Sequence, residues 1–138
     1  VYILFEKLRK YKDASYELEK DLKELIHILS NGTILPNANY RWLEEYKASF
    51  SNDVIDVLLS CNQKIVDDNK ADLKIKLADV ILIHDKLNEE AVLIKCRTYN
   101  KMDKHSLSKK IFDEFTKTYQ KEHGEEFEQG FDFFISEE

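Results

Sequence analysis

The chain has 138 residues, of which 43% are hydrophobic and 12% are aromatic, so one domain with a buried core is expected. Three glycines and one proline leave few turn signals, which favours long helices over many short strands. The formal net charge is −6 at pH 7, which argues against the basic stripe that a phosphate backbone requires.

Residues 1–31 are predicted to form an N-terminal helical hairpin. The first helix, over 1–12, is indicated by apolar residues at helical spacing, namely Val1, Leu4, Phe5, Leu8 and Tyr11. Ser15 can cap the second helix, and Asn31-Gly32 can end it because both residues tolerate the left-handed conformation. Because the chain starts with Val1 directly on a helical pattern, we expect a fragment that follows a missing N-terminal domain.

A third helix is predicted to begin near Asn39, after a loop over 33–38. One apolar face continues for more than 20 residues, through Leu43, Tyr46, Phe50, Val54, Val57, Leu58, Cys61 and Ile65. Good caps and poor helix formers interrupt this face at 49–53, so either a bend or a restart near Ser51 is compatible with the sequence.

The fourth helix follows Asn69, which we expect to cap it. Its inward residues are Leu73, Leu77, Ala78, Ile81 and Leu82. The run 80–83 is apolar on all sides, which predicts a central, buried helix. The stretch 84–91 then reads as a helix stop, a tight turn and a helix start, with Asn88 as the N-cap.

The C-terminal part predicts three further helices. One runs over 89–100, and the next is expected to be capped by Asp103 and stopped by Gly124. The buried stripe of that helix is predicted to be Leu107, Ile111, Phe112, Phe115 and Tyr119. Residues 121–138 hold one lysine and seven acids, an acidic tail on a neutral body. Within this tail, a short helix is expected to pack its aromatic residues on the bundle.

An internal repeat is the most specific pattern. Small and aromatic residues alternate with the spacing of a tetratricopeptide unit at Cys96, Tyr99, Ser108, Phe112 and Phe115. The positions 34 residues earlier hold Asn62, Ile65, Lys74, Ala78 and Ile81. We therefore predict one all-α domain over 1–138, with about six or seven helices and tetratricopeptide-like antiparallel hairpins over 39–120. An ordinary helical hairpin with coincidental spacing is the alternative.

The sequence predicts no catalytic residue, metal site or cofactor. Glu24 and His27 have the Glu-x-x-His spacing of a di-iron helix, but such a site needs a second copy, which the chain lacks. A nucleophile elbow, a phosphate-binding glycine loop and an H-E-x-x-H motif are also absent. Two distant cysteines predict reduced thiols in a cytoplasmic protein, and no apolar run approaches ~18 residues, so no membrane contact is expected.

A candidate binding groove follows from the repeat register. In tetratricopeptide arrays the first helix of each pair lines the concave surface, which places Gln63, Arg97, Asn100 and Lys101 there. Arg97 is the best candidate, because its planar fork can hold a carboxylate through two parallel hydrogen bonds. Such a ligand is either an acidic partner segment or this chain's own tail folded back. A solvated Arg97 paired with a neighbouring acid is the alternative.

Several motifs together resemble the bacterial transcriptional activator domain of SARP-type regulators. They are Gly32-x-x-Leu35-Pro36 followed by Trp42-Leu43-Glu44-Glu45, then Asp85-x-Leu87-Asn88-Glu89-Glu90-Ala91, then Tyr119 with His123-Gly124-Glu125-Glu126. The resemblance covers about residues 32–127, and Lys86 stands where that family usually has a proline. It implies a non-catalytic tetratricopeptide-like domain in a transcription regulator, with DNA contacts made by a winged helix that this chain lacks.

The resemblance implies a domain for protein interaction, effector sensing or oligomerisation. Its partners would be another protein, the regulator's own domains or a second copy in a homodimer. The alternative is a stand-alone scaffold that binds a partner peptide in its concave groove. A winged helix before this segment in the full-length protein would decide between the two.

Overall fold

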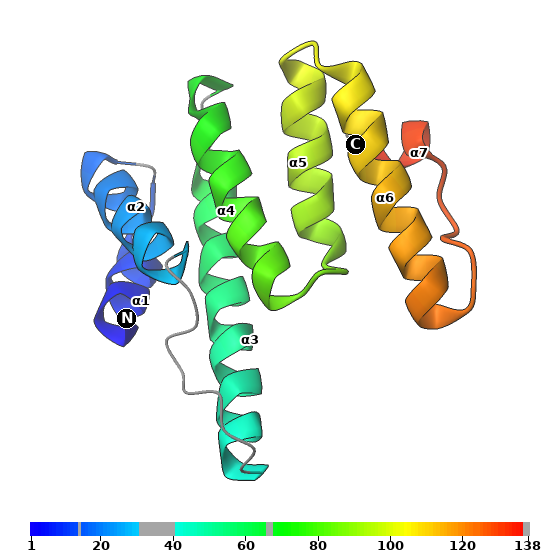
Figure 1. Ribbon diagram of the computed structural model, residues 1–138. Coiled ribbons are helices and arrows are strands. Elements are labelled where there is room, and N and C mark those ends of the chain that lie inside the picture. Colours follow the sequence, from blue (N-terminus) through cyan, green and yellow to red (C-terminus); the bar gives the residue numbers. More distant parts are fainter. Residues whose placement is uncertain (14, 31–40, 66–67, 137–138) are drawn as a thin grey trace.

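The computed structural model describes residues 1–13, 15–30, 41–65 and 68–136, which hold seven α-helices and no strand. The helices are α1 (Tyr2–Lys10), α2 (Tyr16–Ser30), α3 (Arg41–Lys64), α4 (Ala71–His84), α5 (Glu89–Lys101), α6 (His105–His123) and α7 (Phe131–Ile135), with a 3₁₀ turn η1 (Asp68–Lys70) before α4. Neighbouring long helices from α3 to α6 run antiparallel (Figure 1). The predicted all-α array of antiparallel hairpins is therefore confirmed.

The hairpin of α1 and α2 packs against α3 and α4 through an apolar interface. Its buried residues are Leu4, Phe5, Leu8, Leu18, Leu22, Leu25, Ile26 and Leu29. Ser15 caps α2 as predicted, because its Oγ accepts the Leu18 N–H at 3.2 Å. At the end of α3, Lys64 Nζ donates to the Leu8 carbonyl at 3.1 Å. This bond satisfies the carbonyl of Leu8, which lies in the last turn of α1 and has no partner within that helix.

The helix α3 continues without a break through the region where a bend or restart was possible. Its buried stripe outweighs the low helix propensity of 49–53, since tertiary packing supplies most helix stability. This stripe consists of Phe50, Val54, Val57, Leu58 and Cys61. Ser51 is also engaged, with its Oγ 2.9 Å from His84 Nδ1 on α4. The predicted start near Asn39, the Asn31-Gly32 stop, the loop 33–38 and the Leu43 side chain lie outside the described residues.

The helix α4 is central, as predicted, and contacts α2, α3 and α5. Full burial of 80–83 is wrong, because Ile83 is 68% exposed. Ile83 follows the buried Ile81 by about 200° around the helix and so faces solvent. Asn69 is not the N-cap either. It lies within η1, and Lys70 takes the N-cap position without a side-chain capping bond.

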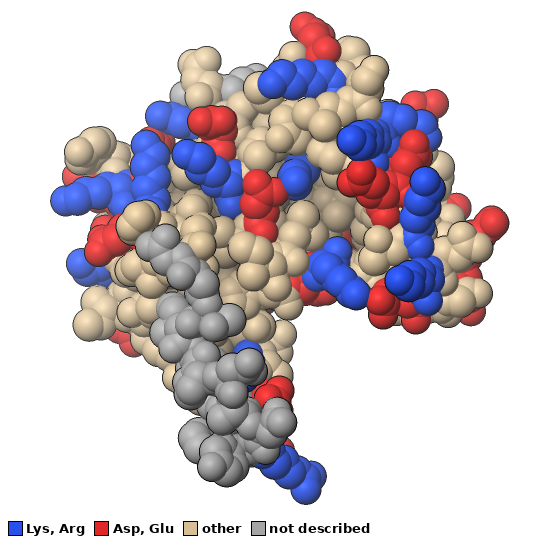
Figure 2. All heavy atoms as spheres, viewed as in Figure 1, with Lys and Arg blue, Asp and Glu red and all other residues tan. Residues whose placement is uncertain are grey.

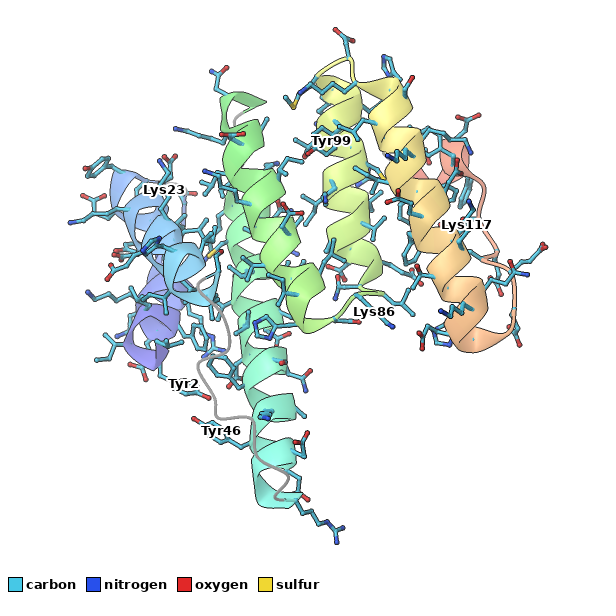
Figure 3. All side chains as sticks on the ribbon, viewed as in Figure 1. Tyr2, Lys23, Tyr46, Lys86, Tyr99 and Lys117 are labelled. Atoms are coloured by element: carbon cyan, nitrogen blue, oxygen red, sulfur yellow. The ribbon has the colours of Figure 1, made fainter. Side chains whose placement is uncertain are left out.

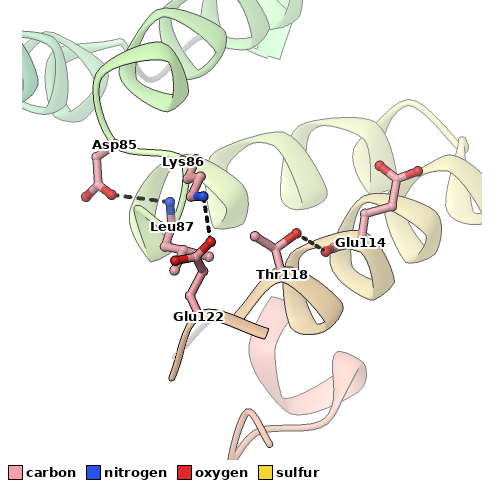
Figure 4. Close-up of polar contacts among 6 residues, drawn as sticks. All are labelled: Asp85, Lys86, Leu87, Glu114, Thr118 and Glu122. Carbon is pink, nitrogen blue, oxygen red and sulfur yellow. Dashed lines mark hydrogen bonds and ion pairs between the residues drawn. The ribbon is translucent and has the colours of Figure 1, made fainter. Parts of the chain in front are cut away.

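The turn between α4 and α5 is held by local and long-range polar contacts (Figure 4). Asn88 caps α5 as predicted, since its Oδ1 accepts the N–H of the third helical residue at 3.0 Å. Asp85 Oδ1 accepts the Leu87 N–H at 3.2 Å. Lys86 Nζ donates to Glu122 Oε1 at 2.8 Å and so ties the turn to α6.

The turn between α5 and α6 corrects the predicted cap of α6. Asp103 has a φ of 61° and occupies the left-handed position of a Schellman motif. The Lys104 N–H donates to the Tyr99 carbonyl at 2.9 Å, and the Asp103 N–H donates to the Asn100 carbonyl at 3.1 Å. Asp103 therefore ends α5 instead of capping α6, and Lys104 precedes α6 without a side-chain capping bond.

The close approach of α5 and α6 occurs at Cys96 and Ser108, as predicted from the repeat. Both residues are 0% exposed. Ser108 Oγ donates to the Cys96 carbonyl at 2.8 Å, and Cys96 Sγ donates to the Ser108 carbonyl at 3.5 Å. Because Ser108 faces α5, the adjacent Leu107 points away and is 39% exposed, so its predicted burial is wrong.

The C-terminal segment packs Phe127, Phe131 and Phe134 on the bundle, as predicted, whereas Phe133 is 69% exposed. Gly124 ends α6 with a φ of 72°, and its N–H donates to the Gln120 carbonyl at 2.8 Å. Beyond it, α7 places Phe134 against Phe112, with ring centroids 5.2 Å apart. Phe127 completes this cluster before the last helix begins.

We expect Phe112→Ala to lower the free energy of unfolding by roughly 3–5 kcal/mol, because it removes a buried ring that contacts α7. Urea denaturation measures the change. The matched control is Leu107→Ala on the exposed side of the same helix, for which a loss of about 1 kcal/mol or less is expected. A loss below about 1 kcal/mol for Phe112→Ala would contradict the packing of α6.

Candidate functional site

A groove of about 700 Å³ lies between α3, α4 and α5. The helices α3 and α5 are the first members of the two antiparallel pairs, and they run in the same direction (Figure 1). The apolar part of the lining comprises Leu59, Leu93, Ile94 and Met102. The charged part comprises Lys74, Glu90, Arg97 and Lys101. The groove thus combines an apolar floor with three basic side chains and one acidic side chain.

Three of the four residues assigned to a groove from the sequence lie along this one. Gln63, Arg97 and Lys101 line it, as the register of the first helices predicts. Asn100 does not, and its Oδ1 instead lies within hydrogen-bonding distance of His105 Nδ1 in the turn between α5 and α6. Its place differs because the tight turn brings the start of α6 against this face of α5.

Two lining residues that we did not predict, Asn62 and Lys74, mark departures from the repeat. They occupy the positions at which the second pair has Cys96 and Ser108, the two small residues that let α5 and α6 meet. Larger polar side chains at these positions of α3 and α4 line the groove instead. The sequence signal was therefore present as the mismatch between the two units.

Asn62 lines the groove. Its Oδ1 points away from solvent, is fully buried and has no hydrogen-bond partner among the described residues, which is uncommon for a buried polar atom.

Arg97 connects the groove to the C-terminal segment. Its Nε donates to the Ile135 carbonyl at 3.2 Å, and its Nη2 donates to the Ser136 carbonyl. The sequence leaves three possibilities for Arg97, namely a partner's acid, the chain's own tail, or solvent with a neighbouring acid. The described contacts are with tail main-chain carbonyls, and no ion pair to Arg97 is present among the described residues.

The cysteine thiols are not suited to reaction in the folded chain. Burial raises the pKa of both Cys61 and Cys96 to about 11. For Cys96, the hydrogen bond with Ser108 and the nearby Lys95 partly oppose this rise in pKa. Thiolates are the reactive form, so at neutral pH both side chains behave as small apolar core residues. Among the described residues, no group of three or more possible metal ligands gathers.

No family model, curated protein or solved structure matches the chain. The geometry therefore defines the class of site by itself, a mixed apolar and basic groove on an all-helical hairpin array. Among the described helices, none is both long and apolar enough to cross a bilayer.

Stability should fall at mildly acidic pH because of His84. Burial lowers the pKa of this histidine below its usual value of 6.5, so the unfolded state binds its proton more readily. The loss of stability is absent above about pH 7.5 and develops as the pH falls through the unfolded value of 6.5. We expect urea denaturation to show a smaller loss between about pH 7.5 and 5.5 in His84→Gln than in wild type.

The control for this measurement is His123→Gln, which replaces an exposed histidine on α6 and leaves the contact between Ser51 and His84 in place. Equal losses in wild type and His84→Gln would contradict the partial burial of His84 between α3 and α4.

Proposed function

We propose that the chain is a non-catalytic protein-interaction module whose groove holds an acidic, extended segment of a partner protein. The observation that carries this proposal is the combination of two groove features. They are the apolar side chains of the lining and the basic residues Lys74, Arg97 and Lys101. A peptide with alternating acidic and apolar side chains matches both through its two faces.

The chemistry of the groove favours a peptide over a small metabolite. A small-molecule site needs a concave pocket that buries most of its ligand, whereas this groove is elongated along α5, from Glu90 to Met102. That span covers more than three helical turns, about 18 Å at 1.5 Å per residue. An extended segment of about five residues covers a similar length.

A regulatory protein is the setting that we propose for this module. The support is the resemblance of its motifs to the bacterial transcriptional activator domain. In that family a helical array follows a winged helix that binds DNA. The partner is then another protein or a regulatory domain of the same polypeptide. The surface charge supports a protein partner, because basic and acidic side chains alternate over the face in Figure 2 without a continuous basic stripe. Buried reduced thiols support a cytoplasmic location.

A direct test uses a fluorescein-labelled short peptide of alternating glutamate and leucine. We expect Lys101→Glu to weaken binding roughly tenfold. An attraction is lost and a repulsion is added, each worth ~0.7 kcal/mol for a partly exposed pair, which together make about 1.4 kcal/mol. Fluorescence anisotropy measures the dissociation constant.

The matched control is Lys23→Glu, which makes the same charge change on an exposed residue of α2, on the far side of α4 from α5 (Figure 3). It should leave binding within about twofold of wild type. Equal weakening by both variants, or equally tight binding of a lysine–leucine peptide, would contradict recognition in the groove. Micromolar binding of duplex DNA at physiological salt would instead indicate a nucleic-acid partner.

A further inference from the structure

We infer that residues 131–136 form a releasable latch that competes with the groove ligand for the guanidinium of Arg97. This inference rests on the proposed function, because it describes how the same groove is regulated. Arg97 lines the groove and also binds the C-terminal segment, so one side chain belongs to both contacts.

Arg97 serves the latch as a C-terminal cap. The helix α7 has only five residues, and the carbonyls of Ile135 and Ser136 at its C-terminal end lie beyond the hydrogen bonds of the helix itself. The Nε and Nη2 atoms of Arg97 supply donors to the carbonyls of Ile135 and Ser136. These two atoms form the same planar edge with which arginine holds a carboxylate through two parallel bonds. A groove carboxylate that uses this edge must therefore replace the two carbonyls.

The exchange favours a charged ligand. A carboxylate holds a guanidinium more strongly than two neutral carbonyls do, because it adds charge–charge attraction and accepts both hydrogen bonds with one planar group. A helix of five residues is also too short to be stable by itself in water. Its docking therefore depends on the Arg97 cap and on apolar packing, in which Phe134 is buried and the ring centroid of Phe131 lies 5.5 Å from that of Phe112. Loss of the cap leaves only this packing.

The rest of the aromatic cluster stays in place when the latch opens. Phe127 packs against Phe115 and Tyr119, with ring centroids 5.1 and 5.2 Å from theirs, and lies before the helix α7. Gly130 separates Phe127 from the latch, and glycine allows more backbone conformations than any other residue. A hinge at Gly130 therefore frees 131–136 without removing Phe127 from α6.

The coupling is reciprocal, which gives two independent readouts. If an acidic ligand opens the latch, removal of the latch must strengthen the ligand by the same factor. The experiment measures the dissociation constant of the glutamate–leucine peptide for wild type, Phe134→Ala, Arg97→Ala and the double variant. The matched control is Phe133→Ala, which truncates the neighbouring ring that is 69% exposed.

We expect Phe134→Ala to tighten peptide binding at least about fivefold and Phe133→Ala to leave it unchanged, since only Phe134 is buried. In the Arg97→Ala background, Phe134→Ala should have no effect, because the shared side chain is gone. In wild type, saturating peptide should speed hydrogen exchange at the amides of Phe134 and Ser136, which bond within the latch. This last readout needs no variant and so stands even where Phe134→Ala fails to fold.

Each outcome decides one of the two ideas. The latch is overturned if Phe134→Ala binds the peptide no more tightly than wild type. It is also overturned if saturating peptide does not speed hydrogen exchange in 131–136 of wild type. Either result leaves the groove as a binding site. Equal tightening with and without Arg97 also overturns it, because the competition then does not pass through this residue. Absence of peptide binding to all four proteins overturns the proposed function itself, and the latch with it.

Discussion

The arrangement of the C-terminal half depends on the contact between Cys96 and Ser108. Each side chain donates to the other's main-chain carbonyl, and neither is exposed. Two helices can meet in this way only when the residues between them are small. The contact fixes the rotation of α5 about its axis, and Arg97, one residue later and about 100° around the helix, then faces the groove.

The same position in the first pair has the opposite consequence. There Asn62 and Lys74 replace the small residues, and both line the groove instead of closing it. One repeat unit thus brings its two helices together through small residues, and the other places larger polar side chains along the groove. The groove therefore lies where the repeat is least regular.

Local signals predicted much of the fold. Ser15, Asn88 and Gly124 end or begin helices through bonds with residues three or four positions away, so the sequence alone contains the information. The close approach of α5 and α6 followed from the repeat spacing. The errors at Ile83 and Leu107 arose because apolar character does not say which side of a helix its neighbours cover. The predicted role of Asp103 as the N-cap of α6 was wrong, because aspartate suits an N-cap but also tolerates the left-handed conformation that ends α5.

The site was less predictable because its geometry comes from distant residues. The sequence register brought Gln63, Arg97 and Lys101 to one groove, but it could not show that Asn100 meets His105. The contact of Arg97 with Ile135 joins residues 38 positions apart and involves main-chain carbonyls, which carry no sequence signature. Side-chain patterns therefore indicated the direction of Arg97 without deciding between the chain's own tail and the other candidate partners.

The free energy of unfolding of Ser108→Val relative to Ser108→Ala tests the central contact most directly. Alanine fits the contact and loses only the hydroxyl bond, whereas valine adds two methyl groups where the helices meet. If α5 and α6 meet at Ser108, the valine variant is less stable than the alanine variant by ~1–3 kcal/mol beyond the difference between the same pair at the exposed position 110. A valine variant as stable as alanine after that correction would show that α5 and α6 do not meet at Ser108.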